Sequence, residues 1–253
     1  MGKMKTRESY ELPYFLWLAF YILVFGSIFN FVVVPIVYTL LIAFAFLQPA
    51  ERLYRFLAGV RPLRTLKEKE RLLPLFEEVY SAALIKYPNL FKGITLYIEE
   101  SMEINAFALG RSTLVITRGS IHLLNDDCLR GLISHELGHF ANHDTLLNQI
   151  AYIGNLPLTL LIKLLAYLAH TWRIFNLIYR PILLINDAIL MSAQRQQEYR
   201  ADQFAFEIGY GDEMISALYE LYAFIVEKPG SIEEQIRRTH PPITRRIEEL
   251  EKM

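Results

Sequence analysis

The 253-residue sequence has one cysteine, Cys128, so it can form neither an internal disulfide nor a zinc site built from cysteines. Its net charge is −1, and this near-neutral balance gives no bulk electrostatic attraction to nucleic acid. The sequence also lacks internal repeats, low-complexity tracts and a glycine-rich nucleotide loop. These absences exclude a disulfide scaffold and give no support to a nucleic-acid partner or a nucleotide-binding enzyme.

Apolar residues are abundant instead. They make up 53% of the chain, yet 21% of the residues are charged, and the mean hydropathy is +0.23. This mixture predicts membrane segments joined to one water-facing domain of roughly 150 residues.

The first hydrophobic region, residues 13–48, contains no charged residue. One helix of that length would measure roughly 50 Å, whereas the hydrocarbon core of a bilayer is ~30 Å thick. Two short crossings with a turn near residues 26–30 therefore fit better than one steep crossing. Basic residues flank the region on both sides, which favours a cytoplasmic location for both ends. We expect a transmembrane hairpin over residues 1–50; a buried hairpin in a soluble protein is the alternative.

A second hydrophobic region covers residues 150–191 and is interrupted by Lys163, Arg173, Arg180 and Asp187. It predicts a second helix pair that crosses the membrane; a pair that lies on the membrane or is packed in the protein is the alternative.

The remaining segments, residues 51–149 and 192–253, predict a water-facing part that is mainly α with a small β-sheet. One helix is expected over residues 65–86, with Pro74 marking a kink or boundary. A second begins at an N-cap at 125–127 and runs to about 148. Further helices are expected over residues 188–208 and 212–227, and a last short one after Pro241 and Pro242. The strands are expected over residues 94–99, 103–108 and 114–117.

The stretch LISHELGHFANHD, residues 132–144, carries the clearest chemistry. His135 and His139 are four residues apart, so on a helix they share a face and can bind one ion. Glu136 stands where it can hold a water molecule at that ion, which completes an H-E-x-x-H signature of two zinc ligands and a general base. Ordinary surface histidines are the alternative, because a short pattern also arises by chance. The signature predicts one Zn²⁺ per chain.

His143 is not expected to be a ligand, because it lies about 80° round the helix from His135. A longer zinc pattern would need Gly and His where this chain has Asn142 and Thr145. The third ligand must therefore come from another part of the chain.

Glu198 is the best candidate for that ligand, in the stretch RQQEYRAD. It would complete a His-His-Glu site and leave the fourth position to water. Asp202, four residues later, would accept a hydrogen bond from the free nitrogen of a ligand histidine. Spacing alone leaves an ordinary solvated helix face equally open, since Arg195 and Arg200 can pair with these acids.

Four motifs resemble the HtpX family of membrane zinc metalloproteases, which is related to the CAAX prenyl proteases. They are INAFALGRSTLVITRG, HELGH, EYRAD and THPPITRRIEEL, in that order. The resemblance implies a zincin-type (gluzincin) catalytic domain with His135, His139 and Glu198 as zinc ligands and Glu136 as base. It also implies that His240 donates to the developing oxyanion and that Arg246 supports it; a helix start at this point is the alternative.

By the same resemblance, Asn105, Ala106, Phe107 and Ala108 form an edge strand on which a protein or peptide substrate adds as a new strand. A core hairpin with Phe107 buried is the alternative. We also hypothesise that Asn155, Asn186 and Asp187 line a polar path from the membrane to the zinc.

The sequence thus predicts a multi-pass protein of the cell membrane, in contact with the bilayer, with its active site facing the cytoplasm. Its expected activity is zinc-dependent hydrolysis of misfolded or membrane proteins. A CAAX-type processing protease, a zinc-binding scaffold and a silent adaptor are the alternatives. Glu136 argues against a scaffold, because a structural zinc site needs no general base.

Overall fold

The structure of the chain is a computed structural model, which describes residues 8–28, 30–90, 92–151, 160, 191, 193–227 and 241–253. The chain divides into two compact units, and each unit is built from two segments that are distant in the sequence. The first unit comprises Met1–Leu47 and Leu147–Gln196, and the second comprises Gln48–Leu146 and Gln197–Met253.

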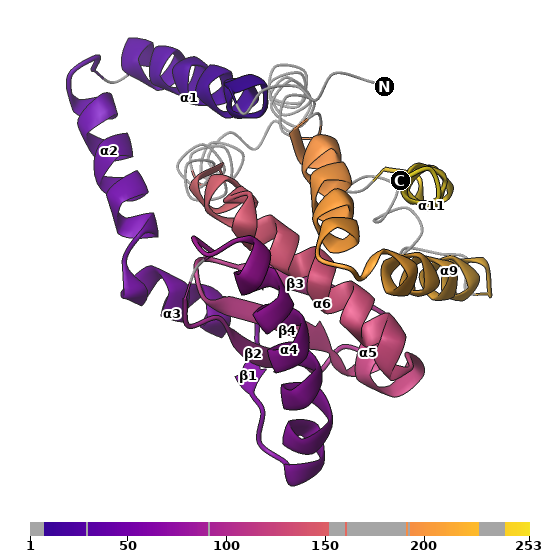
Figure 1. Cartoon of the computed structure of the whole chain (residues 1–253). Coiled ribbons are helices and arrows are strands. Elements are labelled where there is room, and N and C mark those ends of the chain that lie inside the picture. The colour runs from indigo at the N-terminus through magenta and orange to yellow at the C-terminus, as the bar shows by residue number, and fades with distance from the viewer. Residues whose placement is uncertain are drawn as a thin grey trace. The chain divides into compact units, whose positions relative to one another are not determined.

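The first unit contains the expected pair of apolar helices, α1 (Glu8–Ile28) and α2 (Val33–Ala45) (Figure 1). Asn30 lies just before α2, and its Oδ1 accepts hydrogen bonds from the amides of Val32 and Val33 at 2.8 and 3.1 Å, so it satisfies two amides at the start of that helix. The two helices share a buried cluster made of Trp17, Tyr21, Phe25, Val34 and Tyr38.

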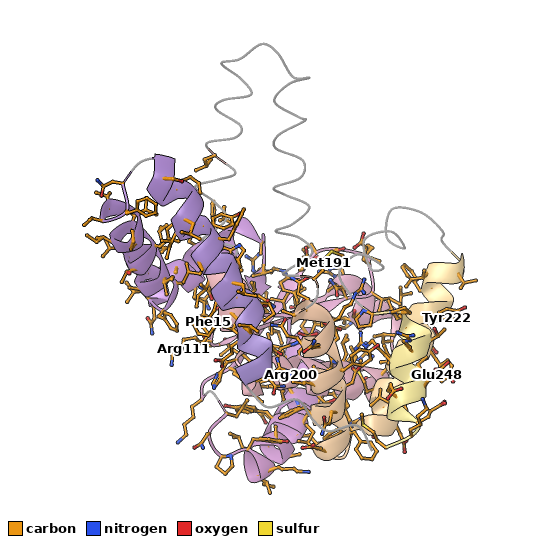
Figure 2. The ribbon with its side chains drawn as sticks, turned by 90° about the horizontal axis from the view of Figure 1, so that it is seen from above. Phe15, Arg111, Met191, Arg200, Tyr222 and Glu248 are labelled. Atoms are coloured by element: carbon orange, nitrogen blue, oxygen red, sulfur yellow. The ribbon has the colours of Figure 1, made fainter. Side chains whose placement is uncertain are left out.

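The other faces of α1 and α2 expose large apolar side chains, such as Phe15 on α1, which is 63% exposed (Figure 2). Among the described residues, no single helix has both the length and the apolar composition needed to cross a membrane. α2 and α3 (Gln48–Leu57), which are bent by 78° relative to each other, meet these criteria only when taken together. The second hydrophobic region lies almost entirely outside the described residues.

The second unit is organised around a four-stranded sheet with the order β1-β2-β4-β3. Its strands are β1 (Arg61–Pro62), β2 (Thr95–Glu99), β3 (Ala106–Leu109) and β4 (Thr113–Thr117). β4 is buried at every position, as expected for a central strand of the sequence TLVIT. It pairs in parallel with β2 and antiparallel with β3. The three predicted strands are confirmed to within three residues, and β1 was not predicted.

Helix α4 (Leu66–Lys86) begins at a complete capping box between Thr65 and Glu68. Pro74 lies inside this helix, so of the two options expected there, a kink or a boundary, the boundary was wrong. The inward face of α4 contributes Leu72 and Val79 to the main hydrophobic core.

Helix α6 (Asp126–Ala141) runs through that core, with Leu129, Ile133, Leu137 and Phe140 fully buried. Its N-cap is Asn125, as predicted. Its end differs from the prediction: α6 stops at Ala141 because His143 adopts a left-handed backbone with φ of 61°, and a new helix begins at residue 144.

The other helices of this unit are α5 (Arg118–Leu123), which was not predicted, α9 (Gly211–Glu227) and α11 (Ile243–Leu250). A helix over residues 193–207 begins in the first unit and has its larger part, from Gln197, in the second. Gly209, with φ of 93°, follows the end of the helix over residues 193–207. α9 packs against both α6 and α11.

Candidate metal centre

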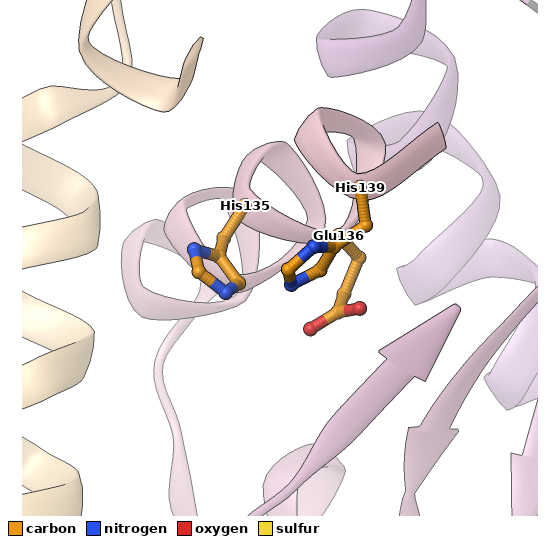
Figure 3. A group of neighbouring side chains, drawn as sticks. All are labelled: His135, Glu136 and His139. Atoms are coloured by element: carbon orange, nitrogen blue, oxygen red, sulfur yellow. The ribbon is translucent and has the colours of Figure 1, made fainter. Parts of the chain in front are cut away.

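His135, Glu136 and His139 leave helix α6 toward the same space (Figure 3). One ligand atom from each of them lies within 4.8 Å of the other two, a spacing that can hold a metal ion. The helical step of four residues places the two imidazoles one turn apart, with ring centroids 4.9 Å apart and ring planes at 87° to each other.

Glu198 comes to this space from the helix over residues 193–207. Its Oε2 is 3.5 Å from Nε2 of His135, and its Oε1 is 3.5 Å from Nε2 of His139. Neighbouring ligand atoms of a tetrahedral zinc site lie about 3.4 Å apart, because each is about 2.0–2.1 Å from the ion. The two histidines and Glu198 therefore fit zinc, and Glu136 stands beside them as a fourth group.

A glycine in the H-E-x-x-H stretch allows the helix that carries Glu198 to pack closely against α6. A Cβ at Gly138 would lie 2.8 Å from the Cα of Ala201 and 3.1 Å from its carbonyl oxygen. Because both are backbone atoms, a side chain at residue 138 would force the two helices apart. The absent side chain thus brings His135 and His139 within reach of Glu198.

Asp202 lies behind His135, with its Oδ1 2.9 Å from Nδ1 of that histidine. Arg246 on α11 donates to both oxygens of Asp202, at 2.6 and 2.8 Å, and its Nη1 is 2.9 Å from Oε2 of Glu198. All four side chains are buried. Arg246 therefore contacts one expected ligand directly and the carboxylate behind another, a placement that would let it orient both ligands.

Asp144 has the same relation to His139, and it was not among the predicted site residues. Its Oδ2 is 3.2 Å from Nδ1 of His139, and its Oδ1 accepts a hydrogen bond from Arg200 Nη2 at 2.6 Å. Asp144 is completely buried. The turn at His143 returns the chain toward α6, so an acid that closely follows H-E-x-x-H was the available signal.

The centre concentrates negative charge in the protein interior. Glu136, Asp144, Glu198 and Asp202 are buried, and the two guanidiniums of Arg200 and Arg246 leave these four carboxylates with a formal charge of −2. A buried charge of this size is costly unless a cation balances it. This excess favours binding of a divalent metal ion.

The two histidines respond to the same charges. Burial and the Arg246 guanidinium lower the pKa of His135, but the carboxylates of Asp202 and Glu198 outweigh them and raise it above its ordinary value. Burial also lowers the pKa of His139, and Asp144, Glu198 and Glu136 together raise it well above normal. The pocket therefore attracts positive charge to the histidine nitrogens.

Of the residues expected to bind substrate, Ala106, Phe107 and Ala108 lie on β3, and Asn105 precedes it. Asn105 is exposed and Phe107 is only partly buried. β3 is an edge strand in the part of the chain that the structure describes, and it packs on α6. His240, and Asn155, Asn186 and Asp187 of the polar path, lie outside the described residues.

The chain is similar in sequence to known peptidases. Residues 67–253 match Peptidase family M48. A protein named Protease HtpX homolog from Thermoanaerobacter pseudethanolicus is 29% identical over 218 residues, which cover 71% of this chain and 70% of that protein. A protein of the same name from Pyrococcus abyssi is 29% identical over 192 residues, which cover 62% of this chain and 66% of that protein.

A solved structure shares the fold. The crystal structure of S. mikatae Ste24p matches with a TM-score of 0.54 and 17% sequence identity. The match covers 92% of this chain and 61% of the Ste24p chain, so the chain spans about three fifths of that protein.

Proposed function

The chain belongs to peptidase family M48, and from this premise we propose that it is a zinc-dependent endopeptidase of the cell membrane. The observation that carries the proposal is the convergence of Glu198 on both histidines. Each of its oxygens lies 3.5 Å from one Nε2 atom, and Glu136 forms a group with the same two histidines.

In this proposal His135, His139 and Glu198 hold the metal, and Glu136 acts as general base. Bound zinc would lower the pKa of water and polarise the scissile carbonyl group. Glu136 takes a proton from the attacking water and delivers it to the leaving amine as the peptide C–N bond breaks. Asp202 and Asp144 keep a proton on Nδ1 of each histidine, so that each Nε2 faces the metal.

The open edge of β3 is the proposed substrate site. The carbonyl of Asn105 accepts a hydrogen bond from the amide of Thr117 on β4, at 3.1 Å. Backbone groups alternate in direction along an antiparallel strand, so those of Ala106 and Ala108 point to the open edge. An extended peptide would pair with them, and backbone pairing of this kind gives loose sequence preference.

Membrane attachment is part of the proposal. It is supported by the uncharged residues 13–48, by the basic residues on both sides of them, and by the exposed apolar side chains of α1 and α2. The same basic flanks favour an active site that faces the cytoplasm, and loose preference suits misfolded or membrane proteins as substrates. A zinc scaffold is less well supported, because Glu136 has no role in a purely structural site.

The test is cleavage of unfolded casein by the full chain, purified in detergent, with wild type compared with Glu136→Gln. Zinc content is measured on both proteins by mass spectrometry. We expect zinc in both and cleavage by the wild type alone, because Gln cannot accept the proton. Zinc in both proteins with cleavage by neither would overturn the proposal in favour of a scaffold or adaptor.

A further inference from the structure

We propose that Glu51 is a positioning residue for substrate binding, which holds the β3–β4 hairpin so that β3 is ready to accept a peptide strand. This inference rests on the proposed function, because it concerns the edge strand that a substrate would join. It is carried by contacts within the second unit, at both ends of β3.

Glu51 lies on α3 and is buried against the turn that joins β3 to β4. Its Oε1 accepts three hydrogen bonds, from the amide of Ser112 at 3.0 Å, from Ser112 Oγ at 2.7 Å and from Thr113 Oγ1 at 2.7 Å. One oxygen on a helix thus fixes two consecutive residues of the hairpin, through backbone as well as side-chain groups.

The turn is shaped to admit this side chain. Gly110 has φ of 58°, a left-handed conformation that other residues adopt at a cost. A Cβ at Gly110 would lie 3.0 Å from Cδ of Glu51 and 3.1 Å from its Cγ. Glycine at this position therefore satisfies both the turn and the close approach of the carboxyl group.

A second contact holds α3 on the sheet, one helical turn after Glu51. Arg55 Nη1 donates to the hydroxyl of Tyr97 on β2 at 2.8 Å, and its guanidinium carbon lies 4.9 Å from the centre of the Tyr97 ring. Because Arg55 is bound to β2 and Glu51 to the hairpin, α3 is attached at two points and gives the hairpin a firm support.

The other end of β3 is held separately. The amide of Asn105 donates to Ser120 Oγ at 2.8 Å and to Thr117 Oγ1 at 3.1 Å. The carbonyl of the same residue accepts from the amide of Thr117 at 3.1 Å. β3 is therefore fixed at its start by the Thr117–Ser120 turn and at its end by Glu51, while its outer edge has no neighbouring strand among the described elements.

These contacts preorganise β3 for binding. A peptide binds more tightly to a strand that is already held in place, because less conformational entropy has to be lost to order that strand. Glu51 does not touch the reacting atoms, so its removal is expected to weaken substrate binding and to leave the chemical step intact. This separates it from Glu136 and from the residues that position the metal ligands.

The experiment compares Glu51→Ala, Glu51→Gln and the control Glu70→Ala, an exposed acid on α4, in the detergent-purified full chain. KM and kcat are measured on an extended, internally quenched peptide, together with zinc content. We expect Glu51→Ala to raise KM about five- to tenfold, with kcat within about twofold of wild type. Glu51→Gln keeps an acceptor oxygen and is expected to restore KM, and Glu70→Ala is expected to leave it unchanged.

Ser112→Ala is the milder variant in case Glu51→Ala does not fold. It removes one of the three donors and is expected to raise KM by a smaller factor. An unchanged KM in folded Glu51→Ala, or in Ser112→Ala where the first does not fold, would overturn the inference while the wild type stays active. A fall in kcat with unchanged KM would also overturn it. Failure of the proposed function is distinguishable, because the wild type itself would then be inactive.

Discussion

Asp144 stands behind His139, with its Oδ2 3.2 Å from the Nδ1 atom, as Asp202 stands behind His135 at 2.9 Å. Each of these carboxylates is in turn bound by an arginine, Arg200 for Asp144 and Arg246 for Asp202. The two histidines of the candidate centre therefore have equivalent support from different helices. This support fixes which nitrogen of each imidazole would face a bound metal ion.

Asp144→Asn is expected to lower zinc affinity by about 10- to 100-fold, as for other residues that orient a metal ligand through a hydrogen bond. The amide removes the negative charge and can present a donor to Nδ1 of His139. Zinc affinity is measured by competition with a chromophoric chelator. Asp212→Asn, an exposed acid on α9, is the control, and equal affinities in the two variants would contradict the role of Asp144.

Gly138→Ala is expected to lower zinc content and to destabilise the protein by about 1–3 kcal/mol, because the new Cβ overpacks the contact with Ala201. The helix that carries Glu198 must move away from α6 to accept it. Zinc content and the melting temperature of the full chain in detergent are the two readouts. A variant with normal zinc content and melting temperature would show that the helices do not approach so closely.

Arg246→Ala is expected to destabilise the protein by about 3–5 kcal/mol, because it leaves Asp202 and Glu198 buried without their guanidinium. Arg246→Lys retains the charge but cannot donate to both carboxylates in the same forked arrangement. We expect its stability to lie between those of alanine and wild type in urea denaturation. Equal stability of the lysine variant and the wild type would argue against the bridging role.

Glu68 is expected to make stability depend on acid pH. Its pKa is lowered to about 2 by the hydrogen bond from Arg61, assisted by the backbone amides of Thr65 and Arg64. The folded pKa lies below the ordinary value of 4.5, so the stabilisation is complete above about pH 4.5 and is lost as the pH falls toward 2. The melting temperature should fall less steeply between pH 5 and pH 3 in Glu68→Gln than in wild type. Parallel curves would contradict the assignment.

Most helices and strands could be predicted from the sequence, because the residue patterns that mark them lie within the element itself. The capping residues Thr65 and Asn125 mark the starts of α4 and α6, and alternating or continuous apolar residues mark β2 and β4. The short strand β1 carries no such signal, because its two residues are strand only through pairing with β2. The left-handed residue His143 was missed because glycine, not histidine, usually occupies that conformation.

Part of the candidate centre could also be predicted from the sequence, because some of its residues are related by local spacing. The step of four between His135 and His139 is a helical relation, whereas the pairing of Asp144 with His139 depends on a reversal of the chain. The two bonds of Arg246 to Asp202 and its contact with Glu198 depend on how α11 packs, which no spacing in the sequence specifies. The hydrogen bond from the Ser112 amide to Glu51 likewise depends on tertiary packing, because the two residues are far apart in the sequence.

The discontinuity of the second unit has a consequence for biogenesis. The segment up to Leu146 leaves the ribosome first, and it carries His135, Glu136 and His139. Glu198 and then Arg246 are synthesised only after the whole intervening segment of the first unit. A nascent chain that has emerged only as far as the first unit's second segment therefore has no complete metal centre. The order of translation thus delays completion of the candidate metal centre until α11 has been made.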